Sequence, residues 1–345
     1  MFQLSCLPGL LPPTAGSRSR EVLKVVSVAS LLLVALTCLH AGPAQAGPLK
    51  DALERRAAER QAAAQGADEM AGETTERTGF QRGLPAGVTR LSNLAWGDGP
   101  DRKLDVYRPA SFPAGTPAAG APLLFMVHGG GWKHGDKAAG SVVDNKVAHW
   151  VTKGVVLVSV NYPMLPGTDP VRQAAEVAKA LAWTQRQAAS WGADPARVVL
   201  MGHSAGAHLV ALNSADPAVA KAEGARPWLG TVVLDTATHD VVETMSASHA
   251  RLYDEAFGTD QAYWRQASPL HRLTGVPAPM LLVCSSRRSS SCPQAQSFDG
   301  RLKTAGARST VLPQNLSHRS INADLGESGA YTAAVDAFLR SVGWP

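Results

Sequence analysis

Short apolar runs alternate with amphipathic stretches along most of this chain, from about residue 89 to its end. Several of the runs are apolar at every position, which is typical of strands that are buried on both faces. Their alternation with helical stretches predicts an α/β fold with a mostly parallel, eight-stranded sheet covered by helices on both sides. The predicted strands are residues 89–95, 103–107, 123–127, 155–160, 198–201, 231–234, 280–284 and 309–312.

Helical periodicity is clearest in residues 170–189, where apolar positions recur at spacings of three and four. Further helices are predicted at residues 205–213, 293–305 and 329–342. Residues 236–273 are longer than an ordinary connection between strands, so we expect a small insertion that caps a substrate site. This insertion carries four aromatic residues, Tyr253, Phe257, Tyr263 and Trp264.

The first residues follow a different pattern, which predicts a signal peptide over residues 1–46. A basic stretch precedes the apolar run 25–39, and the small residues Ala44 and Ala46 supply a cleavage site. We therefore expect export, to the periplasm or the medium. A membrane anchor is the alternative, which the shortness of the apolar run disfavours.

Length and composition favour one catalytic domain. The 345 residues are 45% hydrophobic, which is enough for one large core. We expect residues 47–88 to form a leader helix and a linker, and residues 89–345 to form the domain.

The formal charge of +5 is not concentrated in any basic stretch, so we expect no nucleic-acid partner. We also expect no stable membrane insertion after signal cleavage, and the oligomeric state stays open.

Cysteine and histidine spacing bears on disulfides and cofactors. Cys6 and Cys38 lie in the predicted signal peptide, which leaves Cys284 and Cys292 in the mature chain. Export favours a disulfide between these two, with two buried free thiols as the alternative. No cluster of histidines or cysteines has the spacing of metal ligands, so we expect neither a metal nor an organic cofactor.

A serine on a sharp turn is the clearest chemical signal. The strand at residues 198–201 runs into Gly202-His203-Ser204-Ala205-Gly206, and a helical stretch follows. Gly-x-Ser-x-Gly between a strand and a helix holds a nucleophile above the sheet, and its glycines remove side chains that would collide there. These residues predict an α/β-hydrolase fold with Ser204 as the nucleophile.

A glycine-rich loop, His128-Gly129-Gly130-Gly131-Trp132, follows the strand at residues 123–127. Glycines let backbone N–H groups approach a developing oxyanion closely. Together with the serine turn, this loop resembles hormone-sensitive-lipase-like and feruloyl-esterase-like carboxylesterases, with kynurenine formamidases as relatives. The resemblance implies that the N–H groups of Gly130, Gly131 and Ala205 form the oxyanion hole. It extends over most of the domain, including residues 104–109, 160–162 and 193–197.

A general base must take the proton of Ser204, and histidine is the usual choice near neutral pH. His318 lies after the last predicted strand and before the last helix, where this fold carries its base. We therefore predict that His318 is the base. His128 is expected to shape the glycine-rich loop instead, and His203 lies inside the serine turn.

The acid that should orient His318 is missing from its usual place. The resembled esterases carry it a few residues after the strand that corresponds to residues 280–284. Here the loop that follows holds only serine and arginine, over residues 285–291. A disulfide between Cys284 and Cys292 would fix this loop and could hold the site open to an acid from elsewhere.

Asp235 is the predicted acid, because it ends the strand at residues 231–234 and could reach His318 from the neighbouring edge of the sheet. Its placement resembles that of the acid in pancreatic-type lipases. Asp240 is one alternative. The other is a pair of Ser204 and His318 that is assisted only by Ser289 or Ser290, which should be slow.

The combined pattern predicts an exported serine carboxylic-ester hydrolase that acts on small or medium acyl or aryl esters through an acyl-enzyme on Ser204. A small-molecule ester is therefore the expected partner. An amidase or aryl-formamidase on the same scaffold is one alternative. A non-catalytic binding protein that keeps the fold is another, and the missing acid is its only support.

Overall fold

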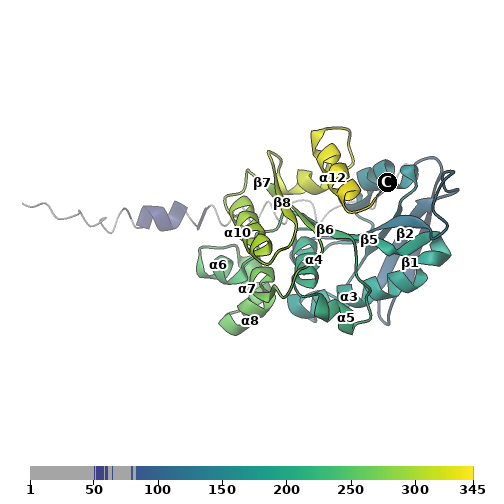
Figure 1. Cartoon of the computed structure of the whole chain (residues 1–345). Coiled ribbons are helices and arrows are strands. Elements are labelled where there is room, and N and C mark those ends of the chain that lie inside the picture. Colours follow the sequence, from purple (N-terminus) through teal and green to yellow (C-terminus); the bar gives the residue numbers. More distant parts are fainter. Residues whose placement is uncertain are drawn as a thin grey trace, which may run out of the picture. The chain divides into compact units, whose positions relative to one another are not determined.

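A computed structural model shows the domain that follows the predicted leader (Figure 1). It describes residues 50, 52–57, 59–60, 64, 79–80 and 83–344. The predicted signal peptide, residues 1–46, lies outside the described residues. In the predicted leader and linker, the described residues between 50 and 64 are helical. Among the described residues, no helix combines the length and the apolar character that crossing a membrane requires.

One sheet of eight strands runs through the domain, in the order β1-β2-β4-β3-β5-β6-β7-β8. The two pairs that involve β2 are antiparallel, and all the other pairs are parallel. The predicted mostly parallel sheet is therefore confirmed. The strands are β1 (Val88–Ala95), β2 (Lys103–Pro109), β3 (Ala121–Val127), β4 (Val156–Val160), β5 (Ala193–His203), β6 (Gly230–Leu234), β7 (Met280–Ser285) and β8 (Ser309–Gln314).

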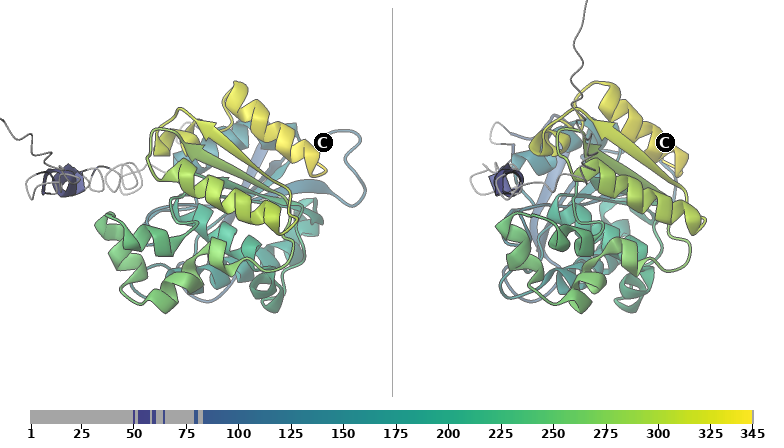
Figure 2. Two further views of the ribbon diagram at one scale, coloured as in Figure 1. Left: turned by 60° about the vertical axis from the view of Figure 1, so that its left-hand side comes forward. Right: turned by 90° about the vertical axis from the view of Figure 1, so that its left-hand side faces the viewer.

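Helices cover both faces of this sheet (Figure 2). The α-helices are α2 (Gly140–Trp150), α3 (Pro170–Gln187), α4 (Ala205–Ala215), α5 (Pro217–Ala222), α6 (Val241–Ser246), α7 (Arg251–Phe257), α8 (Gln261–Ala267), α9 (Pro269–Arg272), α10 (Ser291–Thr304), α11 (His318–Ala323) and α12 (Ala330–Ser341). Two short 3-10 helices are η1 (Val151–Lys153) and η2 (Ala188–Trp191).

Alternate residues of β3 enter two separate cores. Leu123 and Phe125 pack on the face that α3, α4 and α10 cover. Leu124 and Met126 pack on the opposite face, which α2, α11 and α12 cover. Every residue of β3 is buried. This explains why its sequence is apolar at each position.

The predicted elements agree with the structure to within two residues at each end, except in β5, which begins at Ala193 instead of residue 198. Helix α2 was not predicted, although Val142, Val143 and Val147 are buried on one of its faces. Its start gives little warning, because Ala139 at the N-cap offers no side-chain hydrogen bond.

The predicted insertion, residues 236–273, contains α6, α7, α8 and α9, and two of its aromatic residues contact Trp132 of the glycine-rich loop. The ring of Phe257 lies 4.9 Å from that of Trp132 at an interplanar angle of 70°. His208 of α4 accepts from Trp132 Nε1 at 3.2 Å and donates to the Ala267 carbonyl at 2.6 Å. Burial lowers the pKa of His208 to about 4, so the ring is neutral and can make both bonds.

Tyr253, Phe257 and Tyr263 connect the insertion to the rest of the domain. Tyr253 and Phe257 are buried beside Trp132. The Tyr263 hydroxyl donates to Asp169 Oδ1 at 3.0 Å, at the start of α3. Trp264 Nε1 donates to the Phe257 carbonyl at 3.2 Å. The insertion is therefore packed onto the glycine-rich loop, α3 and α4.

Candidate active site

Ser204 lies on the turn between β5 and α4, with φ 54° and ψ −120°. A non-glycine residue in this conformation is strained by about 1–3 kcal/mol, and the surrounding structure must hold it there. The Ser204 N–H donates to the Leu234 carbonyl at 3.0 Å. A Cβ on Gly202 would lie 2.3 Å from the Gly206 carbonyl oxygen, and one on Gly206 would lie 2.3 Å from that of Val127. The turn therefore requires both glycines.

The glycine-rich loop packs against this turn, because Gly206 touches the backbone of Val127 where β3 ends. Gly130 and Gly131 have φ values of 114° and 58°, which glycine adopts at no steric cost. Within the described part of the chain, the N–H groups of Gly130, Gly131 and Ala205 have no protein acceptor. All three N–H groups are therefore available to an anionic oxygen.

Buried contacts of His128 and Tyr162 stabilise the start of this loop. The Tyr162 hydroxyl donates to the His128 carbonyl at 3.0 Å, and the two rings stack 4.7 Å apart. Nδ1 of His128 lies 2.7 Å from the Gly129 carbonyl oxygen, to which it can donate. Both residues are buried. These contacts match the predicted role of His128 in shaping the loop.

Asp235 and His318 meet in the buried space beyond the strand ends. Asp235 directly follows β6, and His318 begins α11. His318 Nδ1 lies 2.6 Å from Asp235 Oδ2, and the two side chains are 2% and 0% exposed. Asp235 Oδ1 accepts the Ser285 N–H at 2.7 Å and the Ser291 hydroxyl. The structure thus brings the predicted acid to the predicted base.

The same pair lies beside the serine turn. His203, the residue before Ser204, donates from Nε2 to the His318 carbonyl at 3.0 Å, and the two rings are 4.4 Å apart. The backbone bond from Ser204 to Leu234 places the turn next to Asp235. Among the described residues, His318 Nε2 is buried without a hydrogen-bond partner. It is therefore the nitrogen that can accept the proton of Ser204.

The charges of this cluster suit a general base. Burial alone would raise the pKa of Asp235, but Arg288, His318 and Ser291 outweigh it and hold that pKa well below its usual value. Burial lowers the pKa of His318, and Arg288 and His203 lower it further, against the opposite effect of Asp235. At neutral pH the carboxyl group is therefore an anion and the imidazole is neutral.

Arg288, like Ser285 and Ser291, belongs to this cluster although no role there was predicted for it from the sequence. It is 5% exposed, and its Nη1 lies 3.0 Å from Asp235 Oδ2 and 3.1 Å from His318 Nδ1. The sequence feature that could have identified Arg288 is its position, because it lies in the loop where the resembled esterases carry the acid.

Asp240 has a different role. It is the N-cap of α6, where Oδ1 accepts the N–H groups of Val242 and Glu243 at 2.9 and 3.2 Å. The same oxygen lies 3.2 Å from His271 Nε2. With Asp235 on His318, neither Asp240 nor a serine of the loop is needed as a substitute acid.

The structure joins Cys284 and Cys292 in a disulfide, with their Cα atoms 5.1 Å apart. The bond links the end of β7 to the first turn of α10. It closes the loop that carries Arg288 and two of the groups that bind Asp235, namely the Ser285 N–H and the Ser291 hydroxyl. The covalent link thus restrains the loop that surrounds the acid.

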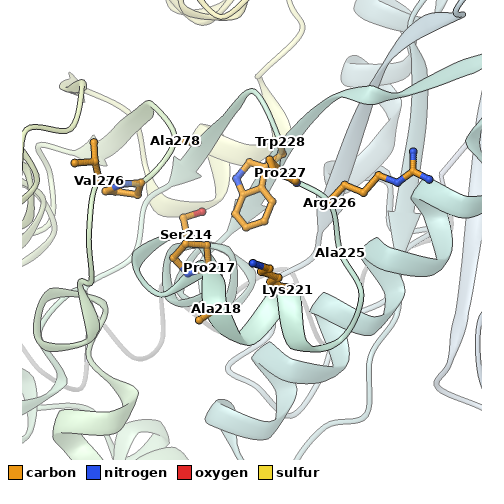
Figure 3. Close-up of a pocket in the computed structure, with 11 residues that line it drawn as sticks. Ser214, Pro217, Ala218, Lys221, Ala225, Arg226, Pro227, Trp228, Val276 and Ala278 are labelled. Atoms are coloured by element: carbon orange, nitrogen blue, oxygen red, sulfur yellow. The ribbon is translucent and has the colours of Figure 1, made fainter.

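A cavity of about 640 Å³ lies elsewhere in the domain (Figure 3). It is lined by residues that precede β6 and β7, such as Trp228 and Ala278, and by α5. Ser204 and Asp235 follow the opposite ends of their strands, so this cavity is separate from their site. Among the described residues, no three histidine, cysteine or acidic side chains are grouped as metal ligands would be.

Comparison with known proteins identifies the family and the fold. The BD-FAE family model matches residues 104–299. Esterase LipC of Mycobacterium tuberculosis is 29% identical to this chain, and the match covers 72% of this chain and 64% of LipC. Kynurenine formamidase of Salmo salar is 33% identical over 41% of this chain and 42% of its own length.

Among solved structures, Esterase B of Lactobacillus rhamnosis, inhibited by a tributyrin phosphonate, superimposes with a TM-score of 0.61. The two are 21% identical, and the match covers 85% of this chain and 92% of the esterase. These matches confirm the predicted α/β-hydrolase fold and the predicted resemblance to carboxylesterases.

Removal of the disulfide should weaken the domain. For a cross-link between cysteines 8 residues apart, we expect Cys284→Ser/Cys292→Ser to lower the free energy of unfolding by about 2–3 kcal/mol, because the unfolded chain gains freedom. Urea denaturation measures this loss. Dithiothreitol should reproduce it in the wild type and leave the double variant unchanged. Two free thiols in the non-reduced wild type, found by mass spectrometry, would contradict the pairing.

Proposed function

Because the chain belongs to the BD-FAE family, we propose that it is a serine carboxylic-ester hydrolase. The observation that carries this proposal is the buried contact between Asp235 and His318 beside Ser204. Esterase LipC and Esterase B, which resemble this chain, support the same class of reaction.

The proposed reaction uses two acyl-transfer steps. Ser204 Oγ attacks the ester carbonyl while His318 Nε2 takes its proton, and Asp235 stabilises the imidazolium. The N–H groups of Gly130, Gly131 and Ala205 bind the oxyanion, where each donor contributes about 3–4 kcal/mol of transition-state stabilisation. His318 then returns the proton to the leaving alcohol, and water releases the acyl group by the same route in reverse.

We propose small or medium acyl or aryl esters as substrates. The inhibitor of Esterase B carries short acyl chains, as its tributyrin name indicates. In this chain Tyr253 and Phe257 of the insertion pack against Trp132 of the glycine-rich loop, which favours a short substrate. The likeness to kynurenine formamidase makes an aryl formamide the second substrate class to assay.

A non-catalytic binding protein is disfavoured on physical grounds. Its only support was the empty acid position after β7, and Asp235 now supplies a carboxylate to His318 from β6. A strained serine turn and three available N–H groups are difficult to explain without chemistry at Ser204.

Turnover by Ser204 tests the reaction class. We expect wild-type protein to hydrolyse p-nitrophenyl acetate and butyrate, and Ser204→Ala to lower kcat by at least about 10⁴-fold, because no acyl-enzyme can form. Ser190→Ala is the matched control, since Ser190 is exposed on η2. A folded wild-type protein that hydrolyses neither ester would contradict the esterase proposal. If it hydrolyses an aryl formamide alone, the formamidase proposal is supported instead.

Export is proposed from the first 46 residues, and the disulfide supports it, because such bonds persist in oxidising compartments. When the chain is expressed in a bacterial host, we expect the periplasmic or secreted protein to begin at Gly47 on N-terminal sequencing. Ala46→Phe should leave the signal uncleaved. A cytoplasmic product that begins at Met1 would contradict export.

A further inference from the structure

Arg288 brings a permanent positive charge into the Asp235–His318 pair. Its side chain is 3% exposed, and its Nη1 lies within 3.1 Å of both partners. The neighbouring Arg287 is exposed and donates from Nε to Asn315 Oδ1 at 2.9 Å. Of these two adjacent arginines, only Arg288 is directed into the site.

The bonding pattern shows what Arg288 does there. His318 must carry its proton on Nδ1 if Nε2 is to act as a base, so Nδ1–H donates to Asp235 Oδ2. Arg288 donates only, and it therefore donates to the same oxygen, at 3.0 Å. The 3.1 Å approach of Nη1 to Nδ1 is then a contact between two donors. It resists a second proton on the imidazole.

The groups that face this pair come from several elements. Asp235 follows β6, His203 ends β5, and Arg288 lies in the loop after β7. His239 and Tyr331 also interact electrostatically with Asp235, but burial lowers the pKa of His239 to about 3 and raises that of Tyr331 well above its usual value. Of these groups, only Arg288 is a permanent cation.

Building on the proposed function, we infer that Arg288 is a positioning residue that occupies the place of the missing loop acid. It holds Asp235 Oδ2 toward His318, and its charge extends the activity of the base to lower pH. The disulfide between Cys284 and Cys292 restrains the loop that delivers it. A merely structural ion pair would stabilise the loop without moving the pH profile.

The pH dependence of kcat/KM tests this role. The active base is neutral His318, which exists above its pKa, so activity is lost as pH falls through that value. Removing the cation should raise the pKa, and Arg288→Gln should therefore move the acid limb upward by about one pH unit or more. Arg288→Lys keeps the charge and should move the limb less. Arg287→Gln is the matched control and should leave the limb in place.

An NMR titration of His318 in Ser204→Ala protein, with and without Arg288→Gln, gives a second readout that needs no turnover. A His318→Gln spectrum assigns the signal. An unchanged His318 pKa and an unchanged acid limb in folded Arg288→Gln would overturn the inference and leave the esterase proposal intact. If Arg288→Gln raises the His318 pKa but the wild-type protein hydrolyses neither ester, the role of Arg288 is supported and the esterase proposal is refuted.

Discussion

The buried hydrogen bond between Asp235 and His318 is the interaction on which the arrangement of this site depends. A carboxylate that is fully removed from water is unfavourable by several kcal/mol unless it is paired and hydrogen-bonded. Asp235 has such partners in His318, Arg288, the Ser285 N–H and the Ser291 hydroxyl. These partners come from the end of β7, the loop after it, the start of α10 and α11, so the requirement to satisfy one charge fixes these four segments together.

Backbone strain is also found at the carboxyl ends of the parallel strands, where Asp235 lies. Trp132, Ser204 and Asp235 all have φ between 54° and 61°, and they follow β3, β5 and β6. Residues other than glycine rarely adopt this conformation, and it tends to persist where the surrounding structure serves a function. Parallel strands bring their carboxyl ends to one edge, which is where an α/β sheet places its ligand site. The strained residues and the unpartnered N–H groups therefore lie where chemistry is expected.

The sequence was sufficient for the parts of the site that short segments define. Ser204 and the glycine-rich loop can be identified from the glycines that their backbone requires. His318 can be identified from its position between the last strand and the last helix. The acid was harder, because no residue fills the usual position. Asp235 could be proposed only from the expectation that its strand neighbours the one before the loop, and β6 does pair with β7.

Other features could not be predicted because they depend on packing between distant segments. The burial of Arg288 against Asp235 needs the loop after β7, β6 and α11 at once, whereas its neighbour Arg287 is exposed. The helix α11 has six residues, too few for a clear hydrophobic period. The partner of the aromatic side chains in the insertion also depends on such packing, since Tyr253 and Phe257 contact Trp132, more than 100 positions earlier in the chain.

The most direct test of the central claim is the kcat of Asp235→Asn on p-nitrophenyl acetate, compared with that of Asp240→Asn. If Asp235 is the acid, the amide should lower kcat by about 10⁴-fold, because it cannot stabilise the imidazolium or hold the required tautomer. Asp240→Asn should stay near the wild type, since Asp240 caps α6 and contacts His271. A folded Asp235→Asn protein with wild-type kcat would contradict the account.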